Sequence, residues 1–317
     1  MRNIYSNIFK VNNKNLSKAV NNLKKNRLIG VPTETVYGLA GNAYSKEAVK
    51  KIYFLKKRPF KNPLIIHYFN LNQLKNDVEL NKNFYKLFKK FCPGPITFVL
   101  KKKKNSLLAN IATANLKTVA VRIPNNKTIR RILKSLNFPL AIPSANKSTQ
   151  VSPVSAKDVS SELGNSLKFI LNGGSCKIGI ESTVVDLTSK AKILRPGLIN
   201  PSDISKVLKK KTRVYKGSKF IKAPGMLKRH YSPGIPIKLN QKKIKKGEAF
   251  IVFGKKYKNA KNIFNLSYNS NLNEAARNLY RILRLIKKKN YKIIYVSSIP
   301  KTGIGLAIND RLERAAR

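Results

Sequence analysis

Histidine, cysteine and acidic residues are scarce in this chain of 317 residues. Its two histidines, His67 and His230, are too few for most zinc centres or a Ser-His-Asp triad. Its two cysteines, Cys92 and Cys176, lack the paired spacing of a zinc site or a disulfide framework. These shortages exclude many metalloenzyme and hydrolase classes, and they favour a reduced, cytoplasmic setting.

Long apolar runs are absent as well. No stretch approaches the roughly 20 apolar residues that a membrane-spanning helix needs, and residues 1–15 lack the apolar core of a signal peptide. Hydrophobic residues still make up 42% of the chain, which is ample for a core. We therefore expect a globular protein with no membrane segment, and the length suggests two domains.

The shortage of acids produces an extreme charge, because 66 Lys and Arg face only 13 Asp and Glu, for a net charge of +53. Such a charge attracts the phosphates of nucleic acids. The excess is mostly lysine spread from end to end, whereas nucleic-acid-binding proteins more often concentrate charge on one face or tail. Compositional drift and a selected affinity for RNA both remain open, and neither specifies a base.

Helical and strand-like patterns alternate along the first two thirds of the chain. Apolar spacing predicts helices around residues 16–23, 48–55, 129–136, 156–163 and 204–208. Apolar runs predict strands at 28–31, 64–68, 96–100, 119–123, 140–142, 169–171, 183–187 and 192–194. This alternation predicts an α/β fold with a twisted mixed sheet.

A second, smaller α/β unit is predicted near the C-terminus. After Lys210 the periodicity stops and Pro-Gly pairs appear, which is typical of a linker. Strands at 249–253 and 293–297, a helix at 272–286 and a last helix from about residue 306 follow. We therefore expect a domain at 1–212, a linker at 213–237 and a small domain at 238–317.

Polar clusters follow several of the predicted strands. Thr33-Glu34-Thr35 comes directly after the strand at 28–31, where α/β proteins place ligands, although a strand-end turn is an alternative. Arg58 offers a fork for phosphate or carboxylate, or else caps a helix. His67, with Asn62 nearby, is either a ligand contact or a satisfied strand histidine.

Arg122 lies inside an otherwise apolar strand, so it needs an anionic partner. A structural glutamate and a ligand carboxylate are equally good candidates. Ser144, Ser148 and Ser152 suit a phosphate cradle, although a serine turn is the alternative. With further clusters at 172–174, 179–183 and 195–197, five polar groups are each expected at a strand end. Such ends can converge on one pocket.

These motifs together resemble the YrdC/Sua-type family of L-threonylcarbamoyladenylate synthases. The matching segments fall in the family's order across roughly residues 15–210. They are Pro32–Leu39, Lys56–Pro59, Asn62–His67, Pro93–Thr97, Thr118–Arg122, Pro143–Asn146, Glu181–Asp186 and Leu194–Gly197. Pro224–Pro233 and Gly303–Leu312 resemble the linker and the C-terminal domain of the long, two-domain form.

The resemblance implies a fold and a reaction. The expected fold is a twisted mixed-sheet domain with a ligand cavity, plus a small Rossmann-like domain. The expected activity is that of a nucleotidyltransferase: L-threonine, bicarbonate and ATP, with Mg2+, give threonylcarbamoyl-AMP and pyrophosphate. The product serves tRNA threonylcarbamoyladenosine modification through a separate transferase. The linker would act as a lid over the labile product.

The resemblance also assigns roles to individual residues. The threonine-binding set is Thr35, His67, Arg122, Ile142 and Ser182. The ATP-binding set is Arg58, Asn62, Thr118, Ser144, Ser152, Arg195 and Tyr231. No side chain is expected to form a covalent intermediate, since the chemistry needs positioning and charge neutralisation. No metal-ligating residue is assigned.

The chain departs from the family pattern at two places. Thr149 stands where the family usually carries Gly, and Leu227-Lys228 stands where a Tyr is often found. Two rival classes compete with this reading. One is a non-catalytic RNA-binding protein of the same fold, with weak tRNA contact through the basic surface. The other is a carbamoyl-transfer module, whose acylphosphatase and zinc-finger segments this sequence lacks.

Overall fold

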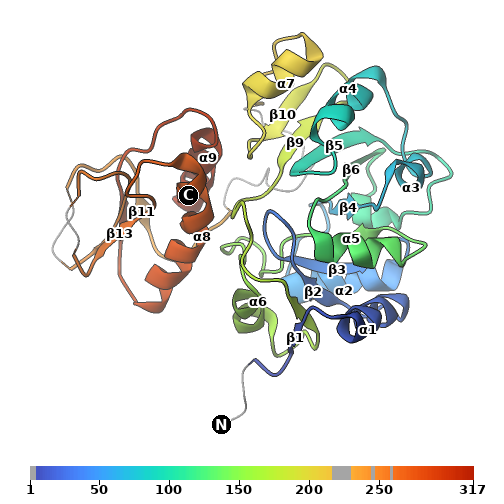
Figure 1. Cartoon of the computed structure of the whole chain (residues 1–317), viewed down its shortest axis with the longest axis horizontal. Helices are drawn as coiled ribbons and strands as arrows, with labels where there is room; N and C mark the ends of the chain where they lie inside the picture. The colour runs from blue at the N-terminus through green and yellow to red at the C-terminus, as the bar shows by residue number, and fades with distance from the viewer. Residues whose placement is uncertain (1–4, 216–229, 244–246, 258–259) are drawn as a thin grey trace.

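The chain folds into a larger and a smaller α/β unit (Figure 1). The computed structural model describes residues 5–215, 230–243, 247–257 and 260–317. Within these residues, ten strands form one mixed sheet in the larger unit, in the order β1-β8-β2-β3-β7-β4-β6-β5-β9-β10. Four strands form a second, parallel sheet, in the order β11-β14-β12-β13. The predicted fold class is confirmed.

The larger sheet mixes parallel and antiparallel pairs. Its strands are β1 (Ile8–Lys10), β2 (Ile29–Val31), β3 (Gly38–Asn42), β4 (Ile65–His67), β5 (Ile96–Lys101), β6 (Thr118–Arg122), β7 (Leu140–Ala141), β8 (Ile170–Asn172), β9 (Thr183–Asp186) and β10 (Lys192–Arg195). β4 pairs parallel with β6, and β5 pairs antiparallel with β6 and parallel with β9. The ends of β4 and β6 therefore lie at the same edge as the starts of β5 and β9.

Helices cover this sheet, and asparagine side chains cap many of them. They are α1 (Asn13–Lys24), α2 (Lys46–Lys56), α3 (Leu71–Lys75), α4 (Lys82–Phe91), η1 (Asn110–Thr113), α5 (Lys127–Lys134), α6 (Ala156–Leu163) and α7 (Pro201–Leu208). Asn12, Asn70, Asn81 and Asn126 each accept a backbone N–H from the first turn that follows. An Asn cap supplies an acceptor for an otherwise unpaired N–H, and replacing it with Ala costs about 1 kcal/mol.

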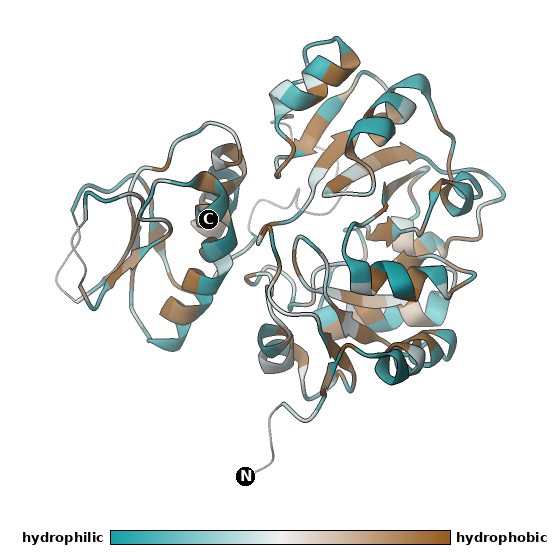
Figure 2. Cartoon of the chain, in the orientation of Figure 1, coloured by the Kyte–Doolittle hydropathy of each residue, from teal (hydrophilic) through white to brown (hydrophobic). Residues whose placement is uncertain are grey.

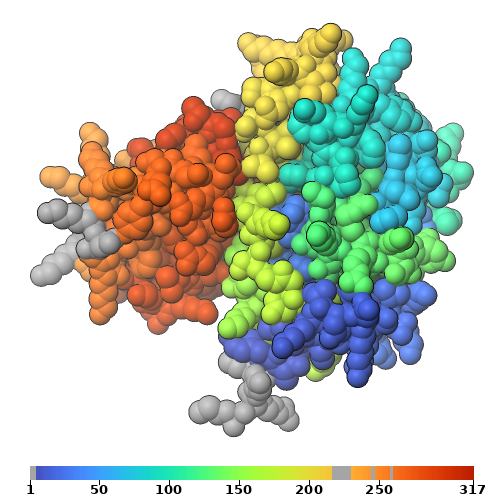
Figure 3. All heavy atoms as spheres, viewed as in Figure 1, coloured from blue at the N-terminus to red at the C-terminus, as the bar shows by residue number. Residues whose placement is uncertain are grey.

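The smaller unit has its two helices next to the larger one. Its elements are β11 (Ile237–Lys238), β12 (Ala249–Val252), β13 (Ile263–Asn265), α8 (Leu272–Lys288), β14 (Ile294–Val296) and α9 (Gly305–Ala315). Figure 3 shows its orange and red atoms packed against yellow-green atoms of the larger unit. One buried apolar cluster includes residues of both units, and Figure 2 shows the brown strands and helix faces that build it.

All the predicted helices and strands are present, with small shifts of their ends. The sequence patterns missed β1, β3, β11, β13, α3 and α4. The missed strands have two to five residues, too few to show a period, and β3 contains Gly38 and Gly41. In α4, aromatic residues alternate with lysines, which obscured its buried Phe84 and Leu87.

The predicted domain limits at 212 and 237 stay predictions. Part of the proposed linker, including Leu227-Lys228 and Pro224 to Arg229, lies outside the described residues. None of the helices in the described part of the chain is long and apolar enough to cross a membrane.

Candidate active site

A small cavity of about 40 Å³ lies in the middle of the large sheet, on the side where the central strands β4 and β6 end. Nine of the twelve predicted site residues line it. The lining residues are Thr35, Val36, Arg58, Ile65, His67, Arg122, Ile142, Pro143, Ser144, Glu181, Ser182, Arg195, His230 and Tyr231. Segments up to 196 residues apart in the sequence thus meet at one place.

Sheet topology explains this convergence. His67 ends β4 and Arg122 ends β6, and the two residues are register partners in this parallel pair. Ile142 follows β7, and its N–H donates to the carbonyl of Ile65 on β4. Gly38 allows Ile142 to approach β3 closely, because a Cβ at residue 38 would lie 2.2 Å from the Ile142 side chain.

One prediction about placement was wrong. Glu181 and Ser182 were expected at a strand end, but they directly precede β9. They still reach the site, because β5 is antiparallel to β6 and β9 is parallel to β5. The start of β9 therefore lies on the same side of the sheet as the end of β6. Arg58 follows helix α2, in the turn where the sequence pattern placed it. Asn172 ends β8 and residues 173–174 follow it, but none of the three lines the cavity.

Arg122 finds its anionic partner in Glu34. The Arg122 Nη2 atom lies 2.7 Å from Glu34 Oε1, and Arg122 Nη1 donates to Thr35 Oγ1 at 3.0 Å. Burial raises the pKa of Glu34, but the ion pair with Arg122 outweighs it and leaves that pKa below its usual value. Of the two candidates that the sequence left open, the structural glutamate is present, and room for a ligand remains at the same guanidinium.

Arg58 is held by the loop that follows it. Its Nε and Nη2 atoms donate to the carbonyl and side-chain oxygens of Asn62 at 2.9 and 2.7 Å, and Nη2 also reaches the carbonyl of Pro63. Burial lowers the pKa of Arg58 to about 10. Lys56, also buried, donates to the carbonyls of Ser144 and Asn146, so it ties α2 to the serine loop. Asn62 therefore acts on the cavity through Arg58.

Ser182 and Arg195 form a second anchored group. The Ser182 hydroxyl lies 2.8 Å from Thr97 Oγ1 and accepts from Arg195 Nη2 at 3.1 Å. Arg195 Nε donates to the Ser182 carbonyl at 3.0 Å. These bonds fix a second guanidinium at the cavity wall, within reach of an anionic ligand.

Glu181 is the centre of a buried polar network that joins the two units. Its carboxylate accepts from Ser152 Oγ at 2.6 Å, from Tyr280 Oη at 2.9 Å and from Arg311 Nε at 3.1 Å. Burial raises the pKa of Glu181, but Arg311 and Arg195 outweigh it and bring the pKa to about 2. Glu181 is therefore a fixed anion, and α8 and α9 help to hold it.

His230 and Tyr231 close the cavity from the segment that precedes the small unit. Tyr231 is fully buried, stacks on Tyr280 with ring centroids 5.8 Å apart, and lies 5.2 Å from the Arg311 guanidinium. It adopts a positive φ of 64°, which is rare for a residue with a side chain. Burial lowers the pKa of His230 to about 3.

Several buried polar atoms around the cavity make no hydrogen bond to the described part of the chain. They are Glu34 Oε2, Asn62 Nδ2, Arg122 Nε, His230 Nδ1 and Tyr231 Oη. Buried polar atoms are nearly always paired in native proteins, so such a cluster marks a place where a polar ligand would complete the bonding.

Three predicted site residues do not line the cavity. Asn62 supports Arg58, Ser152 donates to Glu181, and Thr118 starts β6, four residues before Arg122. Sequence patterns missed Lys56, Thr97, Tyr280 and Arg311 as supporting residues. One signal was available for Glu181: it is one of only 13 acidic residues, and it directly follows the apolar Ile180, in a chain with 66 Lys and Arg.

Comparison with known proteins finds relatives that match nearly the whole chain. The family profile described as telomere recombination, the Sua5–YciO–YrdC profile, matches residues 21–197. A threonylcarbamoyl-AMP synthase of Pyrococcus abyssi is 35% identical over 93% of this chain and 92% of its own. One of Bacillus subtilis is 35% identical over 96% and 94%. The crystal structure of P. abyssi Sua5 with L-threonine superposes with a TM-score of 0.90 and 34% identity, covering 98% and 97% of the two chains.

The chain therefore belongs to the Sua5–YciO–YrdC family. A second profile, that of the threonylcarbamoyl-AMP synthase C-terminal domain, matches residues 199–317. The protein is thus the long, two-domain form of this family, and the resemblance inferred from its motifs is confirmed.

Proposed function

We propose that this protein is a threonylcarbamoyl-AMP synthase, a nucleotidyltransferase that uses L-threonine, bicarbonate and ATP. The observation that carries the proposal is the convergence of Arg122, Arg58 and Arg195 on one buried cavity, together with near full-length similarity to such synthases. Three guanidiniums suit a carboxylate and a polyphosphate. The product would serve the threonylcarbamoyl modification of tRNA through a separate transferase.

The threonine end of the site is assigned to the Arg122 side. Arg122 would bind the threonine carboxylate, with Thr35, His67, Ile142 and Ser182 around it. Burial keeps the pKa of His67 well below its usual value, so its ring is neutral at pH 7. A neutral imidazole can accept a hydrogen bond from the ligand, and it adds no positive charge beside Arg122.

The ATP end is assigned to the Arg58 and Arg195 side, with Ser144 and Tyr231 at its wall. Asn62 and Ser152 act in support, and the ATP-binding role of Thr118 stays a prediction. A cavity of about 40 Å³ is far below the roughly 300 Å³ of a typical ligand pocket. ATP entry therefore calls for a wider cavity, and we expect His230 and Tyr231, at the end of the proposed lid, to move outward.

The reaction balances without a covalent enzyme intermediate. The threonine amine, unprotonated, bonds to the carbon of CO2 or bicarbonate, and bicarbonate releases water. A carbamate oxygen then attacks the α-phosphorus in line, the bond from that phosphorus to the bridging oxygen breaks, and pyrophosphate leaves. The protein aligns the reactants and neutralises charge, which are the main needs of phosphoryl and nucleotidyl transfer.

The part of the chain that the structure describes offers no cluster of metal ligands. The described residues contain no group of three or more His, Cys, Asp or Glu side chains that could hold an ion. Glu34 and Glu181 are both paired with arginines. Mg2+ therefore fits this site only as a companion of the ATP phosphates, where it would neutralise charge. A cytoplasmic location also stays a prediction.

The test is pyrophosphate release by the purified chain with ATP and Mg2+, adding L-threonine and bicarbonate singly and together. Release only with both present, together with threonylcarbamoyl-AMP detected by mass spectrometry, is the expected result. Pyrophosphate release that does not depend on threonine would contradict the proposal.

A further inference from the structure

The serine loop, residues 144–152, connects two groups that belong to the site. Ser144 at its start lines the cavity, and Ser152 at its end donates to Glu181, which also lines it. The first half of the loop is tied to α2, because Lys56 donates to the carbonyls of Ser144 and Asn146. The arrangement of this loop therefore affects the wall at the end of the cavity assigned to ATP.

The second half of the loop, residues 149–152, is bonded to the small unit and to the segment that precedes it. Four consecutive residues each accept a hydrogen bond. The donors are Ser232 for Thr149, Lys287 for Gln150, and Arg284 for Val151 and Ser152. The two halves of the loop thus depend on different units of the molecule.

One face of α8 makes most of these contacts. Tyr280, Arg284 and Lys287 are spaced four and three residues apart, so they lie on the same side of the helix. Tyr280 donates to Glu181, the same carboxylate that accepts from Ser152. The helix therefore runs along the loop and offers it a donor at each turn.

Arg284 is the central contact of this face. Its Nη2 donates to the carbonyl of Val151, and its Nε lies 3.5 Å from the carbonyl of Ser152. Its Nη1 lies 3.3 Å from Glu162 Oε2, and the other oxygen of Glu162 accepts from the N–H of Lys147 at 3.3 Å. A guanidinium is a planar fork with five donor hydrogens, so one side chain can bind all of these acceptors.

Backbone strain explains why the loop needs this support. Thr149 has a φ of 69°, a left-handed conformation that residues with a side chain rarely adopt. A strained residue keeps such a conformation only where the surrounding structure fixes it. The bonds from Ser232 and α8 fix the chain at Thr149 and at the residues that follow it.

We propose that Arg284 is a positioning residue for ATP, because it holds the serine loop in the arrangement in which Ser144 lines the cavity. Without Arg284 the loop would sample other arrangements, and the affinity for ATP would fall with the fraction of chains that keep the loop in place. The Arg284 bonds go to residues 151, 152 and 162, none of which is assigned to threonine. The inference rests on the proposed function, which takes ATP as the ligand at this end.

The first test measures ATP binding to the full chain by titration calorimetry, without threonine and bicarbonate. Arg284→Ala should weaken ATP binding by about tenfold, as expected if about a tenth of the chains keep the loop in place. The matched control is Arg281→Ala on the same helix, because Arg281 is exposed and donates to Asn278 of its own helix. The control should bind ATP like the unmodified chain.

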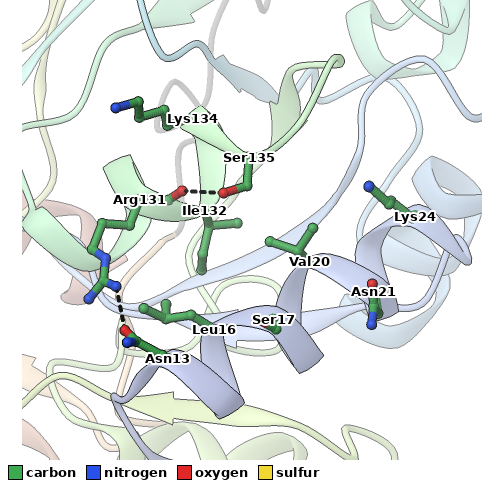
Figure 4. Close-up of a pocket in the computed structure, with 10 residues that line it drawn as sticks. All are labelled: Asn13, Leu16, Ser17, Val20, Asn21, Lys24, Arg131, Ile132, Lys134 and Ser135. Carbon is green, nitrogen blue, oxygen red and sulfur yellow. Dashed lines mark hydrogen bonds between the residues drawn. The ribbon is translucent and has the colours of Figure 1, made fainter.

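A second control removes an arginine that joins two helices elsewhere in the large unit. Arg131 on α5 donates to Asn13 on α1 at 2.7 Å, in an open groove of about 600 Å³ (Figure 4). No residue that lines this groove also lines the cavity. Arg131→Ala therefore removes a bond between helices without altering the site, and ATP binding should not change.

Turnover separates positioning from a general loss of structure. In the pyrophosphate assay, Arg284→Ala should raise KM for ATP by about tenfold and leave KM for threonine within about twofold, whereas partial unfolding would lower kcat alone. Melting temperatures show whether each variant is folded. If Arg284→Ala does not fold, Arg284→Lys replaces it, because an ammonium lacks the fork that binds the carbonyls and Glu162 together.

Three outcomes would decide the proposal. Equal ATP binding by Arg284→Ala and the unmodified chain, or equal losses for Arg284→Ala and Arg281→Ala, would overturn it. Weaker ATP binding by Arg284→Ala in a chain that releases no pyrophosphate with threonine would support the role of Arg284 and contradict the synthase function. Absence of ATP binding to the unmodified chain would overturn both.

Discussion

Arg122 shows at the scale of one residue how burial and binding interact. Its guanidinium is 4% exposed, pairs with Glu34 and still has an Nε without a hydrogen-bond partner in the described chain. A ligand carboxylate would therefore add bonds to an ion pair that the fold already provides. The pairing with Glu34 thus holds the buried arginine in position before an anionic ligand arrives.

Replacing Arg122 with alanine should lower kcat/KM for threonine by about 10- to 100-fold or more, because a charged hydrogen bond is worth roughly 1.5–3 kcal/mol. The measurement is pyrophosphate release against threonine concentration. Since Arg122→Ala leaves Glu34 buried and unpaired, the double variant with Glu34→Gln controls for stability. Unchanged threonine kinetics in the folded double variant would refute the carboxylate assignment.

Arg58→Ala should instead weaken the use of ATP, because Arg58 lies at the end of the cavity assigned to phosphates. We expect KM for ATP to rise by about tenfold or more, again from the loss of charged hydrogen bonds. The check is an ATP titration at saturating threonine and bicarbonate. An effect confined to KM for threonine would mean that Arg58 binds threonine and not ATP, and the assignment of the two ends of the site would be wrong.

Thr149 carries a local strain that the sequence suggested. The resemblance to the family led us to expect Gly at this position, and the structure has a glycine-like backbone there, with φ at 69°. A β-branched residue in this conformation costs about 1–2 kcal/mol. Thr149→Gly should therefore raise the free energy of unfolding by about 1 kcal/mol, measured by urea denaturation. Ser148→Gly, at an ordinary φ, should lower it by about 0.5–1 kcal/mol; the opposite order would contradict the strain.

At the scale of elements, α8 and α9 contribute to the catalytic unit. Tyr280 on α8 and Arg311 on α9 both contact Glu181, and Tyr231 lies between their side chains. Through these contacts the small unit holds Glu181 and the residues that close the cavity in place. The sequence predicted both helices but could not reveal that they would reach across to residue 181.

Tyr280→Phe should destabilise the chain by about 1.5–3 kcal/mol, because it removes a hydroxyl that donates to a buried carboxylate. Thermal and urea unfolding measure the effect. Tyr295→Phe is the matched control in the same unit, since the Tyr295 hydroxyl is buried with no hydrogen-bond partner in the described chain. Equal stabilities of the two variants would show that the Tyr280 bond contributes nothing.

The whole molecule also shows which features a sequence pattern can predict. The strands at 64–68 and 119–123 could be predicted from the sequence because buried strands are continuously apolar. The convergence of residues 35, 67, 122 and 195 was recoverable because polar clusters at strand ends can meet. The position of Glu181 before β9 and its bonds to α8 and α9 depend on strand order and domain packing, which no local pattern encodes.

With only two histidines in the chain, the pH dependence of its free energy of unfolding near pH 6 can be assigned to His67 and His230. Burial lowers the pKa of both histidines, that of His67 well below its usual value and that of His230 to about 3. Below pH 6.5 the unfolded chain binds two protons that the folded chain does not, so the free energy of unfolding must fall as the pH falls.

Between pH 7.5 and 5.0 we expect a loss on the order of 2 kcal/mol from His230, about 1.4 kcal/mol per pH unit below 6.5, and a further loss from His67 in the same direction. Urea unfolding at several pH values measures this slope. His230→Gln should reduce the slope by about half, because one of the two titrating groups is gone while carboxylates titrate mainly at lower pH. An unchanged slope in that variant would mean that His230 is protonated in the folded state and does not lie buried against Tyr231.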